Sequence, residues 1–369
     1  MFKITDLKQP VLGISPMDGV SDSAFRYITK KYGNPDIIYT EFTHVHGLCV
    51  AGDNLLHHFV YDPIERPIIA QIYGKEPEYF YHAAKMVCAL GFDGIDINMG
   101  CPAKTVAQSG SGAALIRTPE LAKEIVAATK KGVEDWVANG ELTGLAGRTQ
   151  RALDEMIETH IKKHADFVGD RSVGMNNLFA KKENLQREMI SVSVKTRIGY
   201  DSPITAEWIS KIAEAKPDWL AVHGRTLKQM YTGFADWNEL KIAVESTDIP
   251  VLVNGDIKNK QDLEKVLSLT GAYGALIGRA LEGNPWAFKE MRGENFKETH
   301  APVAWELTKK IIIEHTRKFV EDKPDPKAFF QMRKHLSWYI NGVENATEIR
   351  VKLMQATSLE DVINILSKY

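Results

Sequence analysis

The sequence is poor in cysteine and carries almost no net charge. Its 369 residues include only three cysteines, Cys49, Cys88 and Cys101. An odd number in so long a chain argues against a disulfide framework and favours a reducing compartment. Lysine and arginine total 46 against 48 aspartates and glutamates, a formal net charge of −2. A nucleic-acid partner would therefore have to meet a local basic face of the protein.

Long hydrophobic runs are also missing. No apolar run reaches the roughly 18 residues of a membrane span, and the N-terminal residues lack the apolar core of a signal peptide. No ordered Cys/His spacing indicates zinc, and the pairs His44/His46 and His57/His58 are interpreted as surface histidines. We therefore expect a soluble, cytoplasmic protein with no membrane partner and no metal.

The sequence does contain a series of short apolar runs that end in Gly, Asn, Asp or Pro, with amphipathic stretches between them. This pattern predicts buried parallel strands alternating with helices. Eight such runs are the number that closes an α/β (β/α)8 TIM barrel. The runs cover residues 11–19, 36–42, 67–74, 91–102, 190–199, 219–225, 250–257 and 274–281.

One step between these runs is much longer than the rest. Asn98 and Lys195, near the ends of the fourth and fifth runs, are 97 residues apart, whereas the other steps are 24–31 residues. A barrel unit takes about 31 residues, so this step contains an insertion, at about residues 140–186. Leu153, Ile157 and Ile161 follow helical spacing and predict an amphipathic helix within it.

After residue 281 the pattern indicates helices alone. Helical spacing covers residues 303–319, 327–339, 346–354 and 359–366. We therefore divide the chain into a barrel domain, residues 1–295, with the insertion at about 140–186, and a small C-terminal helical domain, residues 296–369. The alternative is that the last helices extend the barrel wall.

The active site of such a barrel lies at the carboxyl ends of its strands. The residues that this position supplies are Pro16, Met17, Gln71, Asn98, Cys101, Lys195, Arg197, His223, Arg225, Asn254, Asp256 and Arg279.

Two turns among these strand ends suggest a phosphate site. Asn254-Gly255-Asp256 follows the seventh run and Gly278-Arg279 follows the eighth, which is the usual phosphate-binding corner of barrel enzymes. Glycines let backbone N–H groups approach a phosphate, and Arg279 adds a cation. The alternative is a pair of tight turns with a solvated arginine.

Three further strand-end residues, Gln71, Lys195 and His223, would make such a phosphate site suitable for FMN. An amide can pair with the pyrimidine edge of a flavin, and a cation near N1 stabilises the reduced ring. Each residue alone is weak evidence, and their joint placement on the third, fifth and sixth runs gives the prediction its weight.

Cys101 is the most informative single residue. It follows a strand directly, in a loop rich in glycine and serine. A thiol over a flavin can act as a nucleophile or as a general acid that delivers a proton to carbon. The alternative is a small inert hydrophobic residue, which is the interpretation of Cys49 and Cys88.

These motifs together resemble the tRNA-dihydrouridine synthases, and within them the bacterial type-B branch. The likeness runs from about Val11 to the C-terminus and leaves out only the insertion. The segments that carry it are Asp96-Ile-Asn-Met-Gly-Cys-Pro-Ala-Lys-Thr-Val, Val194-Lys-Thr-Arg-Ile-Gly, His223-Gly-Arg-Thr, Asn254-Gly-Asp-Ile, Gly278-Arg-Ala, Arg333-Lys-His-Leu-Ser-Trp-Tyr and Arg350-Val-Lys-Leu-Met.

The resemblance implies an FMN-binding barrel followed by a helical RNA-binding domain. NADPH would reduce the flavin, hydride would pass to C6 of a uracil in tRNA, and Cys101 would protonate C5 to complete 5,6-dihydrouridine. The target uridine would leave its stack to reach the flavin. The residues that match the family's flavin positions are Pro16, Met17, Asp18, Gln71, Lys195, His223, Asn254, Gly255, Asp256, Gly278 and Arg279.

Substrate contacts are expected from the barrel and from the tail. On the barrel side they are Asn98, Arg197 and Arg225, and on the tail they are Arg333 and Lys334. In the tail, His335, Trp338 and Tyr339 lie beside these cations in the sequence. The alternative is that the apolar residues of this helix belong to the hydrophobic core and that its charged residues are only solvated.

Two other functions stay open on the sequence. One is an FMN-dependent barrel oxidoreductase that acts on a small molecule, as a dihydroorotate dehydrogenase does, which leaves the helical tail unexplained. The other is a phosphate-binding barrel without redox chemistry or a pure RNA-binding module, in which Cys101 is incidental. We expect a monomer whose partner is tRNA.

Overall fold

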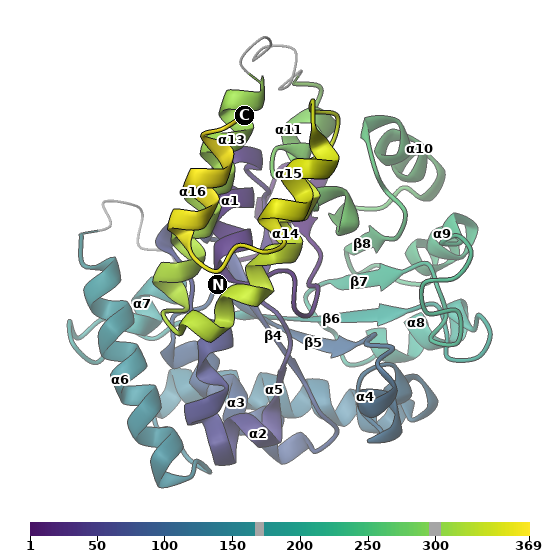
Figure 1. Cartoon of the computed structure of the whole chain (residues 1–369). Coiled ribbons are helices and arrows are strands. Elements are labelled where there is room, and N and C mark those ends of the chain that lie inside the picture. The colour runs from purple at the N-terminus through teal and green to yellow at the C-terminus, as the bar shows by residue number, and fades with distance from the viewer. Residues whose placement is uncertain (167–172, 295–303) are drawn as a thin grey trace.

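Parallel strands closed into a barrel form the centre of the molecule (Figure 1). The structure is a computed structural model that describes residues 1–166, 173–294 and 304–369. The strands are β1 (Val11–Ile14), β2 (Ile38–Tyr39), β3 (Thr43–His44), β4 (Ile68–Tyr73), β5 (Gly94–Met99), β6 (Ser191–Arg197), β7 (Leu220–His223), β8 (Val251–Asn254) and β9 (Gly274–Ile277).

The strand order confirms the predicted (β/α)8 TIM barrel. Neighbours pair in parallel in the order β1-β9-β8-β7-β6-β5-β4-β2, and a parallel bridge between Gly13 and Ile37 closes the ring. The second predicted strand is divided, because β2 and β3 both pair with β4. Between them the Thr40 hydroxyl accepts the Gln71 backbone N–H at 3.0 Å, which replaces a backbone bond of the ladder.

Helices cover the outside of the barrel, where their apolar faces pack on the strands (Figure 1). Their starts follow from the sequence: Asp22 and Asn259 accept backbone N–H groups at the first turns of α1 and α10. The outer helices are α1 (Ser23–Gly33), α3 (Pro77–Ala89), α5 (Pro119–Asn139), α8 (Thr205–Ala213), α9 (Trp237–Glu245), α10 (Lys260–Thr270) and α11 (Ala287–Met291).

The amino ends of the strands enclose a separate apolar cluster inside the barrel. Trp219 and Tyr39 are fully buried there, and the indole N–H of Trp219 donates to the Tyr39 hydroxyl at 2.7 Å. Ile4 and Phe2 pack on the same cluster from the N-terminal segment. Because this end is filled, the polar groups of the barrel interior gather at the opposite, carboxyl end.

The predicted insertion contains two helices, α6 (Gly147–His164) and α7 (Val173–Phe179); its residues 167–172 lie outside the described residues. The helix expected around Leu153 to Ile161 is confirmed by α6. The Thr149 hydroxyl accepts the Gly52 N–H at 3.0 Å, and Lys163 donates to the Tyr61 carbonyl at 2.9 Å. The insertion therefore covers the outer wall beside residues 45–61, on the side away from α4 (Lys104–Gln108) (Figure 1).

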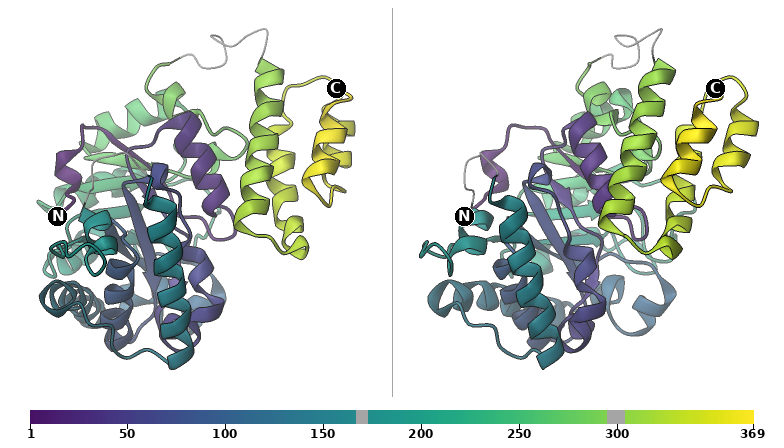
Figure 2. Two further views of the ribbon diagram at one scale, coloured as in Figure 1. Left: turned by 90° about the vertical axis from the view of Figure 1, so that its left-hand side faces the viewer. Right: turned by 60° about the vertical axis from the view of Figure 1, so that its left-hand side comes forward.

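The C-terminal residues form helices only, as predicted. They are α13 (Ala304–Asp322), η7 (Pro326–Gln331), α14 (Met332–Tyr339), α15 (Ala346–Leu353) and α16 (Leu359–Leu366). Figure 2 shows α15 and α16 as the layer farthest from the barrel. Their apolar side chains make a second core, to which α1 adds Ala24 and Ile28.

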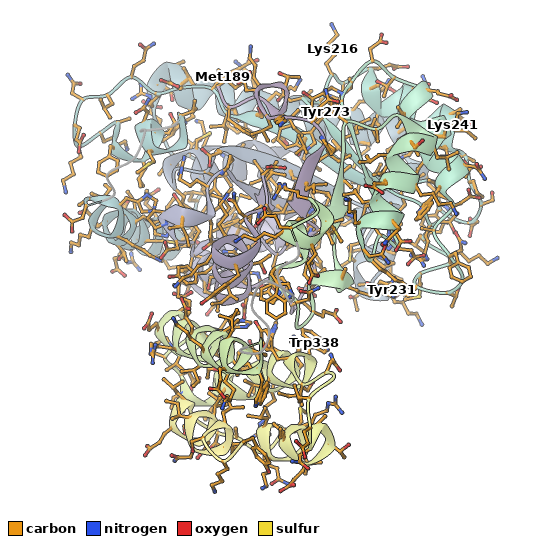
Figure 3. The ribbon with its side chains drawn as sticks, turned by 90° about the horizontal axis from the view of Figure 1, so that it is seen from above. Met189, Lys216, Tyr231, Lys241, Tyr273 and Trp338 are labelled. Atoms are coloured by element: carbon orange, nitrogen blue, oxygen red, sulfur yellow. The ribbon has the colours of Figure 1, made fainter. Side chains whose placement is uncertain are left out.

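The domain division stays a prediction. The boundary at 295/296 and the predicted helix start at residue 303 lie outside the described residues. Figure 3 shows the tail helices as a lobe beside the barrel, with Trp338 at the junction of the two. Among the described residues, no helix combines the length and the apolar character needed to cross a bilayer.

A buried ion pair fastens α1 to the segment before β4. Arg26 donates to Glu65 at 2.7 Å, and the side chains are 1% and 0% exposed. Arg26 also donates to the carbonyls of Ser21 and Val60, and one Glu65 oxygen accepts the Asp62 N–H. All three nitrogens of Arg26 and both carboxylate oxygens of Glu65 thus have hydrogen-bond partners inside the protein.

We predict that Arg26→Met lowers the free energy of unfolding by about 3–5 kcal/mol, because it leaves the Glu65 carboxylate buried without its partner. The measurement is urea denaturation followed by circular dichroism. Arg117→Met is the matched control: Arg117 pairs with Asp201 in solvent, at 56% and 55% exposure, so its loss should change stability by about 0–1 kcal/mol. Equal stability of the two variants would contradict the prediction.

Candidate active site

A chain of amide and carboxylate hydrogen bonds crosses the centre of the barrel mouth. The Gln71 amide of β4 donates to Asp96 of β5 at 2.7 Å, and its oxygen accepts the Asn98 amide at 3.0 Å. Ser193 of β6 donates to the other Asp96 oxygen at 2.6 Å. Burial raises the pKa of Asp96 to about 6, although the bonds from Ser193 and Gln71 lower it. The carboxylate thus stays mostly ionised at neutral pH and fixes both amides.

Asn98 in turn shapes the loop that carries Cys101. Its side-chain oxygen accepts the backbone N–H groups of Gly100 and Cys101, at 3.0 and 2.9 Å. Gly112 closes the far side of the loop. Its φ of +61 is one that residues with a side chain rarely adopt, and an added Cβ would lie 3.3 Å from the Cys101 Cβ. The position of Cys101 is therefore set by its own strand end.

The Cys101 thiol lies among charged groups. It is 8% exposed, and burial raises its pKa, with a further increase from Asp18, against smaller opposite effects of the Ala103 N–H, Arg197 and Lys195. A thiol with a raised pKa keeps its proton at neutral pH. A general acid must carry a proton, whereas a cysteine nucleophile must lose it, so the raised pKa favours the role of general acid.

Two cations of β6, the half-buried Lys195 and the buried Arg197, lie on the same face of the strand. Lys195 donates to the Asn254 side-chain oxygen at 3.2 Å, and burial together with Arg197 lowers its pKa to about 8. Arg197 donates to the Gly100 carbonyl at 2.6 Å and to the Thr226 carbonyl at 3.2 Å. It therefore fixes the other side of the Cys101 loop.

The predicted phosphate corner is built around Asp256. This carboxylate accepts Arg225 at 2.6 Å and Arg279 at 2.8 Å, and also the Ala235 N–H at 2.7 Å. Arg225 is buried, and its Nε has no hydrogen-bond partner among the described residues. Arg279 is 55% exposed, so one guanidinium lies inside the corner and the other at its rim.

Glycine is required at one point of this corner. Gly255 has φ +129, and an added Cβ would lie 2.6 Å from the Ala235 Cβ and 3.0 Å from the His223 ring. His223 is surrounded by cations, and burial together with Arg197 and Lys195 puts its pKa well below the usual value. The histidine is thus neutral, while the positive charge near it is in excess and fits an anionic ligand.

The β1 loop brings Pro16, Met17 and Asp18 to the same mouth. An added Cβ on Gly278 would lie 3.3 Å from the Met17 sulfur, so the β1 and β9 loops touch. Burial raises the pKa of Asp18 and Lys334 lowers it. All the predicted barrel residues therefore gather at one end of the barrel.

The tail residues meet the mouth in part. Lys334 of α14 donates to the Gly19 carbonyl, which places this helix against the β1 loop. Arg333 donates to the Ala356 carbonyl at 2.9 Å within the tail. His335 and Tyr339, expected beside them on an RNA-facing surface, are 1% and 6% exposed, because they pack with Phe25 and His315 between α1 and α13. That part of the expectation is wrong.

Sequence reasoning gave no role to three residues of the site. Asp96 is two residues before Asn98 on the same strand, so both side chains point to the same face of the sheet. This spacing would have been enough to predict Asp96 as a residue of the site. Tyr73 is at the end of β4, where burial raises its pKa and the nearby Cys101 and Asp18 raise it further. Tyr231 has its ring 6.0 Å from the Arg279 guanidinium and is labelled at the edge of the barrel in Figure 3.

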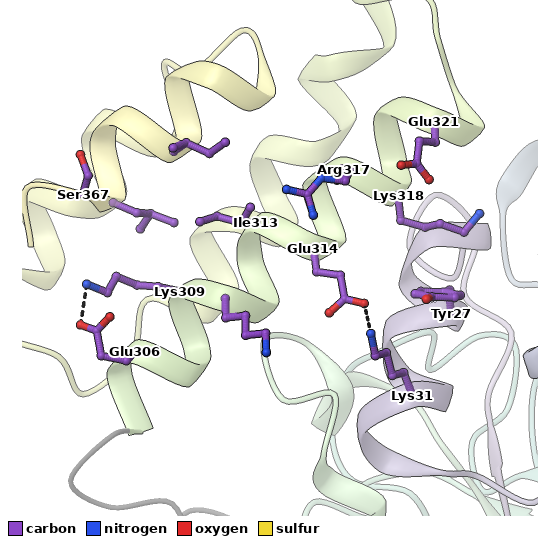
Figure 4. A pocket seen from close by; sticks show the side chains of 13 residues that line it. Tyr27, Lys31, Glu306, Lys309, Ile313, Glu314, Arg317, Lys318, Glu321 and Ser367 are labelled. Atoms are coloured by element: carbon purple, nitrogen blue, oxygen red, sulfur yellow. Dashed lines mark hydrogen bonds and ion pairs between the residues drawn. The ribbon is translucent and has the colours of Figure 1, made fainter.

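A second hollow lies outside this site, between α1, α13 and α16. It has a volume of about 670 Å³ and none of the predicted site residues lines it. Figure 4 shows two ion pairs in its lining: Lys31 of α1 pairs with Glu314 of α13, and Lys309 pairs with Glu306 within α13. Within the described part of the chain, no group of three His, Cys, Asp or Glu residues is arranged to hold a metal ion.

Comparisons with known proteins agree with this geometry. A protein of Staphylococcus epidermidis named "Probable tRNA-dihydrouridine synthase" is 28% identical over 374 residues, which cover 98% of this chain and 94% of that protein. A protein of Bacillus subtilis (strain 168) named "Probable tRNA-dihydrouridine synthase 2" is 29% identical over 379 residues, with 99% and 95% covered.

A solved structure, DHODH in complex with ferulenol from Eimeria tenella, covers 78% of this chain and 81% of its own at 12% identity. Its TM-score is 0.47, a likeness that says nothing about cofactor or substrate.

The model of the dihydrouridine synthase family matches residues 13–141 and 178–368. The residues that it leaves out, 142–177, lie inside the predicted insertion and contain α6. The match includes the Cys101 loop, the strand ends and the tail, and it confirms the predicted family and enzyme class. The chain belongs to the dihydrouridine synthase family.

Proposed function

We propose that this protein reduces uridine in tRNA to 5,6-dihydrouridine, with FMN as its flavin and NADPH as the reductant. The observation that carries the proposal is the Cys101 loop. This chain belongs to the family, and in it Asn98 and Arg197 hold the Cys101 loop from both sides. Burial raises the pKa of the thiol and so keeps it protonated. The names of the relatives support tRNA as the substrate.

The residues of the mouth fit FMN. The buried Arg225, whose Nε has no hydrogen-bond partner among the described residues, and the exposed Arg279 would supply cationic donors for a phosphate. Lys195, Gln71 and His223 would hold the ring, with Pro16, Met17 and Asp18 from the β1 loop and Asn254, Asp256 and Gly278 from the β8 and β9 ends.

Bound FMN, once reduced by NADPH, supplies the hydride that is added to C6 of the uracil. The Cys101 thiol donates its proton to C5, so that both atoms of the former double bond gain hydrogen. Lys195, a half-buried cation whose charge acts on the thiol, stabilises the thiolate that remains. Asn98 acts in this proposal by positioning Cys101, since its amide already holds Gln71 and the loop.

The RNA would be contacted from the barrel by Arg197 and Arg225. From the tail it would be contacted by Arg333 and Lys334. The hydrogen bond from Lys334 to the Gly19 carbonyl of the β1 loop supports this part of the proposal. We further propose that the protein works as a cytoplasmic monomer. The direct test is to incubate the purified protein with NADPH and unmodified tRNA transcripts and to measure dihydrouridine by mass spectrometry. Absence of product from every transcript would overturn the proposal.

Cys101→Ala should retain the flavin and accept electrons from NADPH, and yet form dihydrouridine about 10²–10⁴-fold more slowly, because a general acid is lost. Stopped-flow absorbance measures flavin reduction, and mass spectrometry measures the product. Cys49→Ala, which removes a buried thiol beside the Tyr79 carbonyl, is the control and should keep full activity. Normal turnover by Cys101→Ala would rule out the proton-donor role.

The raised pKa of Cys101 predicts a specific pH dependence. The thiol should keep its proton above pH 8.5, the usual pKa of cysteine, so the rate of Cys101 alkylation by iodoacetamide should rise only at higher pH. Peptide mass spectrometry measures this rate for Cys101 alone. Half-maximal alkylation at or below pH 8.5 would show that the site stabilises the thiolate instead.

Arg279→Ala should weaken FMN binding roughly tenfold to a hundredfold, since a charge-assisted contact to phosphate contributes about 1.5–3 kcal/mol. Fluorescence titration of the flavin-free protein with FMN gives the dissociation constant. Arg148→Ala is the matched control, because Arg148 is 53% exposed and pairs with Asp53 as Arg279 does with Asp256. Equal FMN affinity of the two variants would place the phosphate elsewhere.

A further inference from the structure

Five ring side chains form a continuous row at the edge of the barrel mouth. Phe42 and Tyr73 lie 4.9 Å apart between ring centroids, and Tyr73 lies 5.0 Å from His44. His44 is 6.1 Å from His46, which is 4.6 Å from Tyr79. We call this set, Phe42, Tyr73, His44, His46 and Tyr79, the aromatic row.

The row is a product of the local topology. β3 pairs with the end of β4, with His44 opposite Tyr73. His46 is the second residue of α2 (Val45–Ala51), and Tyr79 is in the first turn of α3. Two strand ends and two helix starts thus place the rings side by side at the carboxyl end of the barrel.

One end of the row adjoins the reactive thiol. Tyr73 is near enough to Cys101 and Asp18 that both raise its pKa. Lys75, two residues further on, lies against the Cys101 loop: an added Cβ on Gly110 would be 3.5 Å from its Cδ. The row therefore extends outward from the place where the target base must lie.

The rings are accessible, unlike the aromatic residues of the nearby core. Phe59 and Phe80 are fully buried, whereas His46 is exposed and the other four members of the row are half-buried. His44 accepts the Gly47 N–H through Nδ1 at 3.3 Å, and burial lowers its pKa. It is therefore neutral and presents a ring face without charge.

Exposed cations lie on the segments that adjoin the row. Lys75 and Lys104, the first residue of α4 on the Cys101 loop, are both exposed and form no ion pair with a described residue. Stacking rings beside free cations are the combination by which proteins bind unpaired nucleic-acid strands, since bases stack on the rings and phosphates meet the charges.

We propose that the aromatic row stacks the unpaired RNA bases that flank the target uridine, with Lys75 and Lys104 at their phosphates. This inference rests on the proposed function for the identity of the RNA. A uridine can turn out of its stack at lower cost where its neighbours are unpaired, and the row replaces the stacking that those neighbours lose. It thereby favours loop regions of RNA over duplex.

His46 gives the cleanest test, because it is exposed and its replacement leaves the core intact. His46→Ala and Tyr73→Leu should each weaken the binding of a fluorescent tRNA transcript and of a short oligouridylate by roughly fivefold to a hundredfold per lost base contact. His46→Phe, which keeps a ring and removes the imidazole, should bind as the wild type does.

The matched control is Tyr273→Leu. Tyr273 precedes β9 at the amino end of the strands, the end opposite the mouth, so its loss should leave RNA affinity unchanged. Flavin content and the rate of flavin reduction by NADPH should be the same in the two His46 variants and in Tyr273→Leu, and the circular dichroism spectrum of Tyr73→Leu should match that of the wild type, which shows that each variant is folded.

The outcomes separate this inference from the function on which it rests. Wild-type affinity for oligouridylate in both His46→Ala and Tyr73→Leu would overturn the stacking role, even where dihydrouridine forms normally. Equal weakening in His46→Phe and His46→Ala would also overturn it, because the imidazole and not the ring would then be the contact. A wild-type protein that binds RNA through the row and forms no dihydrouridine would leave the inference standing and overturn the function.

Discussion

The buried Asp96 carboxylate is the constraint on which the site depends. A carboxylate that is fully removed from water must be paired or hydrogen-bonded, and here Gln71 and Ser193 provide those bonds from the two neighbouring strands. Gln71 then fixes Asn98, and Asn98 fixes the backbone of the Cys101 loop. One buried charge thus sets the register between three strands and the position of the thiol that follows them.

Several cations lie around this network and change the protonation of the groups beside it. Lys195, Arg197, Arg225 and Arg279 act together on His223, whose pKa they lower further than burial alone. Asp256 is shared between two of these arginines. The remaining excess of positive charge favours an anionic ligand. In the proposed reaction it would also stabilise the thiolate that is left when Cys101 gives up its proton.

The tail is joined to the barrel at the mouth and along α1. Lys334 bonds to Gly19 beside Asp18, and Lys323 donates to Asp22 at 2.9 Å. His315, His335 and Phe25 pack between the two parts. These contacts hold the helical lobe against the β1 loop, and in the proposed function an RNA lying across both parts would meet a prearranged surface. The aromatic row lies on another part of the same rim, next to Cys101.

The sequence by itself determined what depends on local pattern. Strand and helix periodicity predicted the barrel, the insertion helix and the helical tail, and the Gly-Cys-Pro-Ala-Lys segment predicted the family. The positions of Gln71, Lys195 and His223 at strand ends were also predictable, because parallel strands in a barrel bring their carboxyl ends together. Only the tertiary structure decided which side chains are buried in contacts within the protein and which stay accessible. His335 and Tyr339 have side chains that are found both at surfaces and in cores, and here they are buried because α13 and α1 cover them. The aromatic row exists because His44 lies opposite Tyr73 in the pairing of β3 with β4. Such pairings join residues far apart in the chain, and spacing along a sequence carries no information about what packs on the other side.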